Sequence, residues 1–148
     1  MHNSLRARMP SQRDAVEAPT FAAARAPRRR ASLAIIVLAS LLAVGMTIQV
    51  FLAGLALFVD SLYWWPHHAL GHSLTPAALV LLVLTLIGRQ PAGVRWRAAV
   101  LVVLLAGQGA LAKIRGAAGA LHPVNAMLLF WLVITLVRAA RSTRAASA

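Results

Sequence analysis

The sequence predicts an all-α integral membrane protein, an antiparallel bundle of four helices with both termini in the cytoplasm. Three observations predict this class. The chain of 148 residues is 60% hydrophobic and 12% charged, whereas a soluble domain carries about 45–50% apolar and about 25% charged residues. The hydrophobic residues gather in four long runs. The basic residues, which give a net charge of +12, lie almost entirely outside these runs.

The four apolar runs define the predicted membrane spans. They lie at about residues 33–59, 66–87, 96–114 and 121–138. A helix that rises 1.5 Å per residue needs about 20 residues to cross the hydrocarbon core, and the first run exceeds this length while the others just reach it. Short connections favour antiparallel neighbours, so residues 32–138 are predicted to form one four-helix transmembrane domain.

Two basic tails flank this domain. Residues 1–31 are polar, rich in Ala, Pro and Arg, and without hydrophobic periodicity, so we expect a disordered cytoplasmic tail. Residues 139–148 form a second basic cytoplasmic tail. The apolar run that follows the first tail is longer than the roughly 7–15 residues of a cleavable signal peptide, which predicts an uncleaved anchor.

The positions of the arginines predict the orientation in the membrane. Cytoplasmic loops carry an excess of Lys and Arg, and arginines gather in the N-terminal tail, in the connection between the second and third spans, and in the C-terminal tail. With four spans these segments share one side, which we assign to the cytoplasmic face of the inner membrane. Lys113 and Arg115 are the exceptions, because they lie in the connection between the third and fourth spans, on the opposite side. Topology thus accounts for the basic composition, and we expect the lipid bilayer rather than a nucleic acid as partner.

Several classes of chemistry are excluded by what the sequence lacks. There is no cysteine, which excludes disulfides, iron–sulfur clusters and thiolate metal sites. No nucleotide-binding loop, hydrolase elbow or carboxylate pair is present, and Asp60 is the one acid of the bundle. The sequence therefore predicts no catalytic residue and leans against an enzyme.

Histidines are the most informative residues. His67, His68 and His72 open the second span, and His122 opens the fourth. Both helices run from outside to inside, so all four histidines are expected at the outer end of the bundle. On a continuous helix, bent at Pro76, His68 and His72 share a face and His67 points about 140° away from His72. Imidazoles within a membrane bundle bind metals or haem, relay protons, or donate hydrogen bonds.

One hypothesis is a haem b site. Such a site needs one histidine from each of two helices, room for a flat macrocycle, and cations beside the propionates. His68 or His72, with His122, would supply the ligands. The other candidate haem-binding residues lie in or after the third span: Gln108, Gly109, Lys113 and Arg115.

Other hypotheses use the same residues. His68, His72 and His122, with Asp60 as a further ligand, would suit zinc or copper. In a third reading the protein is a structural or accessory membrane protein without cofactor, which binds a membrane partner or a second copy of itself, and its histidines only form hydrogen bonds at the interface. A proton-coupled transporter subunit is disfavoured by the lack of intramembrane carboxylates. Gln49 and Gln108 are expected to hydrogen-bond between helices rather than to act in catalysis.

Three segments resemble a family of small bacterial four-span membrane proteins of unknown function. They are Val50–Phe58, Trp64–His72 and Ala120–Ala126, of which the last is the most specific. The resemblance covers roughly residues 33–140.

The chain is also similar, more faintly, to one four-helix half of haem A synthase, in which a His–Arg pair opens the second helix and Leu–His opens the last. This similarity implies a haem pocket with ligands at His67 and His122. The sequence departs from the pattern, since His68 stands in place of the Arg and Trp64 in place of a Glu. The argument from helix faces favours the other two histidines of the second span, so all three stay open.

Overall fold

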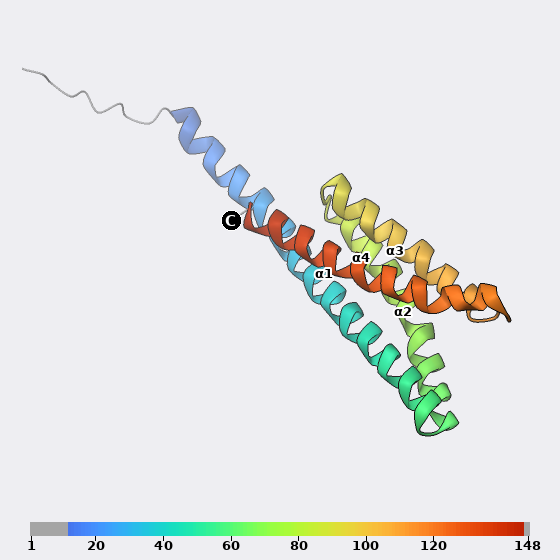
Figure 1. The fold of residues 1–148 in the computed structure, drawn as a ribbon. Helices are drawn as coiled ribbons and strands as arrows, with labels where there is room; N and C mark the ends of the chain where they lie inside the picture. Colours follow the sequence, from blue (N-terminus) through green and yellow to red (C-terminus); the bar gives the residue numbers. More distant parts are fainter. Residues whose placement is uncertain (1–11, 147–148) are drawn as a thin grey trace, which may run out of the picture.

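The computed structural model describes residues 12–146, and the side chains of residues 30–146. Every regular element in this part of the chain is helical (Figure 1). The elements are α1 (Gln12–Phe58), the 3₁₀ helix η1 (Ser61–Tyr63), α2 (Trp64–Ile87), α3 (Ala92–Leu111), the 3₁₀ helix η2 (Ala117–Ala120) and α4 (Leu121–Ala145). The predicted all-α class with four long helices is confirmed.

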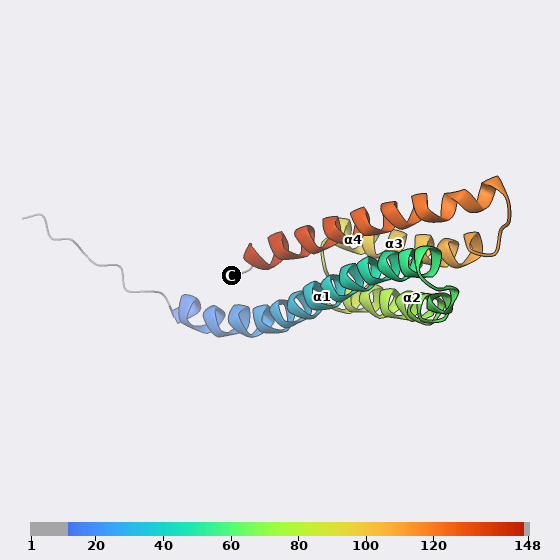
Figure 2. The same cartoon turned by 60° about the horizontal axis from the view of Figure 1, so that its bottom comes forward.

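The four helices form a ring in chain order. α1 packs against α2 and α4, and α3 packs against the same two helices. Figure 2 shows η1 and η2, the connections within the α1–α2 and α3–α4 hairpins, at one end of the bundle. We name this end the histidine end. The α2–α3 turn and the C-terminus of α4 lie at the other end, which we name the arginine end.

All four helices are long and apolar enough to cross a membrane. The segments with this character are Arg30–Phe58, Ser61–Ile87, Ala92–Leu111 and Ala117–Ala145. The chain is therefore a multi-pass membrane protein, as predicted. The third span begins earlier than expected because Pro91 adopts a φ of −53° and a ψ of 150° and so starts α3 directly.

The predicted tails differ in part from the structure. Residues 1–11 and 147–148 lie outside the described residues. From Gln12 on, the backbone is helical and continues without a break into the first span, where the sequence predicts a disordered tail up to residue 31. Alanine and arginine, which are abundant there, are among the strongest helix formers.

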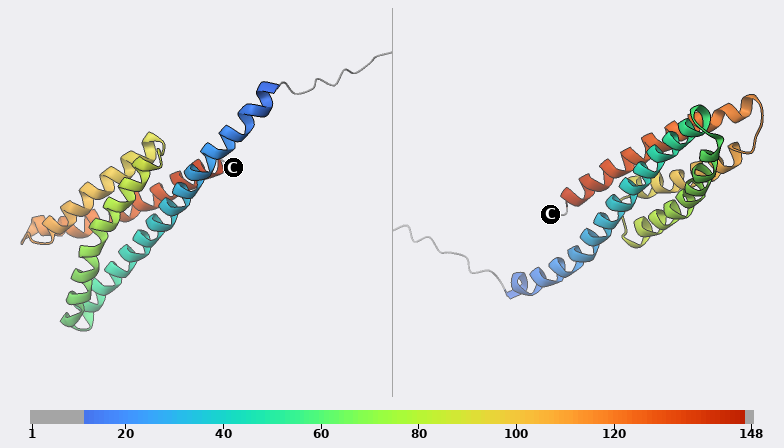
Figure 3. Two further views of the ribbon diagram at one scale, coloured as in Figure 1. Left: turned by 180° about the vertical axis from the view of Figure 1, so that it is seen from behind. Right: turned by 90° about the horizontal axis from the view of Figure 1, so that it is seen from below.

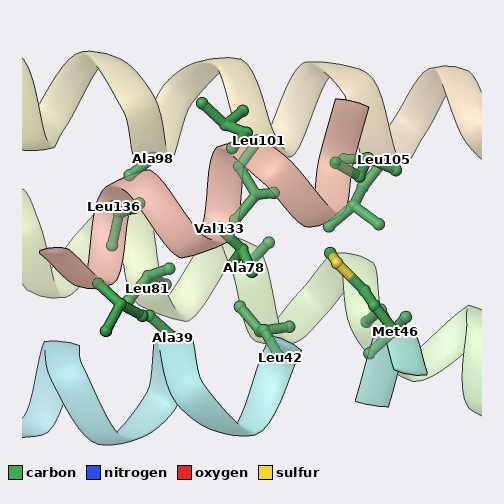
Figure 4. Close-up of a cluster of buried hydrophobic side chains, with 14 of the residues drawn as sticks. Ala39, Leu42, Met46, Ala78, Leu81, Ala98, Leu101, Leu105, Val133 and Leu136 are labelled. Carbon is green, nitrogen blue, oxygen red and sulfur yellow. The ribbon is translucent and has the colours of Figure 1, made fainter. Parts of the chain in front are cut away.

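A single hydrophobic core joins the four helices (Figure 4). Each helix contributes buried residues at alternating spacings of three and four, which is the pattern of interlocking side chains in four-helix bundles. The core residues are Ile35, Ala39, Leu42, Met46, Leu74, Ala78, Leu81, Ala98, Leu101, Leu105, Leu129, Leu132, Val133, Leu136, Val137 and Ala140. Alanines alternate with leucines in it, which lets the helices approach closely, and in lipid such packing rather than hydrophobic burial holds helices together.

This core occupies the half of the bundle nearer the arginine end. It stops at Met46 in α1 and at Leu105 in α3, and begins only at Leu74 in α2 and Leu129 in α4. Toward the histidine end the two hairpins diverge, as Figures 1 and 3 show. Gly54, Gly107 and Gly109 in this half have no neighbouring atom within 4 Å of the position of a Cβ atom. The histidine end is therefore the looser half.

α2 remains helical through Pro76, as expected. It ends in a Schellman motif, in which the N–H of Gln90 donates to the carbonyl of Thr85 and the N–H of Arg89 to that of Leu86, both over 3.0 Å. Arg89 has a φ of 47°, in the left-handed region where glycine is usual. This tight turn sets α3 antiparallel to α2.

Candidate functional site

The histidine end contains two groups of polar contacts, one in each hairpin. His67 at the start of α2 and His122 at the start of α4 are half-buried, whereas His68 and His72 are exposed. The two half-buried histidines are therefore the ones directed toward neighbouring helices.

His122 binds Gln108 of α3 through both ring nitrogens. Its Nδ1 lies 3.2 Å from the backbone carbonyl of Gln108, and its Nε2 lies 3.1 Å from the side-chain Nε2 of the same residue. A backbone carbonyl only accepts and an amide nitrogen only donates. These contacts assign the ring proton to Nδ1. The second amide hydrogen of Gln108 reaches the carbonyl of His122 over 3.0 Å.

Asn125, one turn further into the bundle, completes this group. Its Nδ2 donates to Oε1 of Gln108 over 2.6 Å and to the carbonyl of Leu104 over 2.9 Å. Asn125 is only 8% exposed. Both amide groups thus use all their hydrogens, and the expected interhelical role of Gln108 is confirmed.

His67 forms the corresponding contact in the other hairpin. Its Nδ1 lies 3.1 Å from the backbone carbonyl of Gln49 in α1, and the indole of Trp64 packs edge-on against its ring at a centroid distance of 5.3 Å. The side chain of Gln49 lies over Gly71, where a Cβ atom would come within 2.7 Å of its Nε2. Its Oε1 is buried without a hydrogen-bond partner among the described residues.

The two groups of contacts have the same arrangement. In each hairpin, a histidine at the start of the second helix places Nδ1 against the backbone carbonyl of a glutamine in the first helix. The matched pairs bring both histidines to the same end of the bundle.

The structure does not bring the residues predicted for a zinc or copper site together. No group of three His, Cys, Asp or Glu side chains within residues 30–146 lies close enough to hold a metal ion. The physical reason is helix geometry. His67 faces α1, and His68 and His72 lie on other faces of α2, where both are exposed. Asp60 instead accepts a hydrogen bond from the N–H of Leu62 over 2.8 Å and caps η1.

The remaining predicted residues are dispersed. Lys113 and Arg115 are exposed in the connection that follows α3, and Gly109 is exposed near the end of that helix. His122 lies in the first turn of α4, not at its cap, because η2 leads directly into Leu121. Gly71 was not predicted as part of a site, although it lies one turn after His67 on the same helix face and could have been found by that spacing.

These helices and contacts define the chain as an α-helical, multi-pass membrane protein with polar interhelical contacts at one end. The model of a family of unknown function (DUF6220) matches residues 49–118. This segment begins at Gln49 and includes His67, Gly71 and Gln108, while His122 follows it. No curated protein and no solved structure matches the chain.

Proposed function

We propose that the protein is a small haem-binding membrane protein of cytochrome type, with His67 and His122 as the axial ligands of a haem b between the two hairpins. The observation that carries this proposal is the matched contact of both Nδ1 atoms with backbone carbonyls. A histidine that ligates a metal usually donates its other ring N–H to such a carbonyl, which fixes the tautomer and presents the second nitrogen.

The residues of the histidine end fit a haem in three respects. Nε2 of His67 has no hydrogen-bond partner among the described residues, and that of His122 is held only by the amide of Gln108. Releasing that bond costs about 0.6–2 kcal/mol, which is small beside a coordination bond. The hairpins diverge here, and Lys113 and Arg115 stand exposed nearby for the propionates. A bound haem would supply one-electron transfer.

We also infer that the arginine end faces the cytoplasm and that the protein resides in the inner membrane. The described arginines at that end lie around the start of the first span, in and after the α2–α3 turn, and near the end of α4: Arg30, Arg89, Arg95, Arg97, Arg138, Arg141 and Arg144. The described cations at the histidine end are Lys113 and Arg115. This asymmetry favours cytoplasmic termini.

An absorbance spectrum of the full chain tests the haem proposal. The protein is expressed in haem-replete cells, purified in mild detergent, and compared with variants at each histidine of α2 and α4. We expect a Soret band that His67→Ala and His122→Ala abolish, whereas the matched controls His68→Ala and His72→Ala retain it. A wild-type protein without a Soret band, or equal loss in the controls, would overturn the proposal.

One observation favours a second candidate, an accessory membrane protein without cofactor. The contacts among His122, Gln108 and Asn125 already satisfy every amide hydrogen, so the group needs no ligand to be stable. In that case His122→Ala lowers thermal stability in a protein that has no Soret band at all.

A partner or a second copy should then be recovered by affinity purification in mild detergent, and recovery of the monomer alone counts against this function.

A further inference from the structure

The arginine end has an open cavity of about 320 Å³ between α1 and α4. It is lined by Ile36 of α1 and by Arg141, Arg144 and Ala145 of α4. Figures 1 and 2 show why it forms there, since the C-terminal end of α4 runs beside the part of α1 that extends beyond the other helices. The cavity is far from both histidines and is independent of the proposed haem site.

Two cations meet an apolar wall in this cavity. Arg141 and Arg144 are three residues apart on α4 and so lie on one face of the helix. Ile36 is half-buried on the facing side, next to the exposed Val37, which is 50% accessible. A ligand that fills the cavity must therefore carry an anionic group and hydrocarbon together.

No carboxylate among the described side chains neutralises these arginines. Asp60 is the one acidic residue within residues 30–146, and it caps η1 at the opposite end. Arg144 also lies in the last turn of α4, where the helix dipole supplies partial negative charge. That charge repels an anion, so the attraction has to come from the two guanidinium groups.

The position of the cavity along the spans indicates what kind of anion reaches it. The first span begins at Arg30 and the fourth ends at Ala145, so Ile36 lies just inside the apolar region and Arg144 at its boundary. Phospholipid phosphates lie at this level, and arginine binds phosphate oxygens through two parallel N–H donors. Basic pockets between membrane helices on the cytoplasmic side bind anionic headgroups in the same way.

We propose that this cavity is a binding site for an anionic glycerophospholipid. The phosphate is held by Arg141 and Arg144, and an acyl chain lies along Ile36 and the neighbouring surface of α1. The same chemistry would accept free inorganic phosphate, but only the lipid uses the apolar wall.

Native mass spectrometry of the full chain tests this site. The protein is purified in a neutral maltoside detergent, incubated with equal amounts of phosphatidylglycerol and phosphatidylcholine, and the retained lipid is measured. We expect preferential retention of phosphatidylglycerol, reduced about 30-fold in Arg141→Gln/Arg144→Gln, since each arginine near the surface contributes about 1 kcal/mol to anionic lipid binding and a tenfold change corresponds to about 1.4 kcal/mol. The matched control Arg89→Gln/Arg95→Gln removes the same charge from the same end, in the α2–α3 hairpin and outside the cavity, and should retain the lipid within twofold.

Three outcomes would overturn the proposal. They are no preference for phosphatidylglycerol in the wild type, equal loss in both double variants, and displacement of the lipid by an equal concentration of inorganic phosphate. Helix content by circular dichroism verifies that each variant is folded. If Arg141→Gln/Arg144→Gln fails to fold, Arg141→Lys/Arg144→Lys replaces it. That variant keeps the charge, loses the paired donors, and should still bind the lipid more weakly than wild type.

Discussion

His122 and Gln108 bind one another through three hydrogen bonds that join α3 to α4. The imidazole contacts both the backbone and the side chain of Gln108, and the amide of Gln108 reaches back to the carbonyl of His122. This carbonyl precedes Pro123 in the first turn of α4. The pair therefore fixes the start of α4 against α3 in the half of the bundle that the hydrophobic core does not reach.

Gln108→Leu tests how much this pair contributes. The substitution removes the donor to His122 Nε2 and the acceptor of Asn125, and leaves the buried Asn125 with an unpaired hydrogen. We expect a loss of about 1–3 kcal/mol in the free energy of unfolding, measured by thermal or denaturant unfolding in detergent. Val103→Ala, at an exposed position of the same helix, is the control and should change stability little.

The same variant shows which role Gln108 has in a protein that binds haem. If Gln108 only holds His122 until haem binds, Gln108→Leu keeps the haem-to-protein ratio of the wild type although the haem-free protein is less stable. A Soret band lost together with stability would instead make Gln108 part of the haem site. The haem-to-protein ratio of the purified variant distinguishes these results.

Gly71→Ala tests the corresponding contact in the first hairpin. A Cβ atom there would lie 2.7 Å from Nε2 of Gln49, so the glutamine side chain has to move. We expect a destabilisation of about 1 kcal/mol, which Gln49→Ala in the same chain should relieve. The control is Gly107→Ala, where nothing lies within 4 Å of the added methyl group and the higher helix propensity of alanine should stabilise by up to about 1 kcal/mol. Equal effects at both glycines would contradict this packing.

The two hairpins also show which features can be predicted from sequence. Spans are predictable because a run of apolar residues long enough to cross a bilayer admits few alternatives. The helix ends follow from it within four residues, except that α1 already begins at Gln12 and α4 continues to Ala145. The sequence does not predict which of the three histidines His67, His68 and His72 faces the neighbouring helix. This depends on the rotation of α2 about its axis, which is set by packing of Leu74 and the residues that follow it against α1 and α3. Spacing within α2 alone cannot show which of its faces meets α1.

The left-handed conformation of Arg89 leads to a prediction about stability. Its φ of 47° places a side chain in a region that costs about 1–2 kcal/mol for residues other than glycine. Arg89→Gly should therefore raise the free energy of unfolding by roughly 1 kcal/mol, measured by the same detergent unfolding. The control Arg95→Gly, at an exposed helical position of α3, removes the same charge and should destabilise instead. A destabilising Arg89→Gly would mean that the guanidinium group makes a contact worth more than the backbone strain.

Single cysteines test the orientation, because the chain has no cysteine of its own. Ala118→Cys lies in η2 at the histidine end, and Arg89→Cys lies in the α2–α3 turn at the arginine end; both positions are exposed. If the arginine end faces the cytoplasm, a membrane-impermeant thiol reagent labels Ala118→Cys in intact spheroplasts and labels Arg89→Cys only after lysis. The reverse pattern would place the histidines in the cytoplasmic leaflet. It would also move the cavity of Arg141 and Arg144 to the outer leaflet, so this labelling decides from which leaflet the anionic lipid must come.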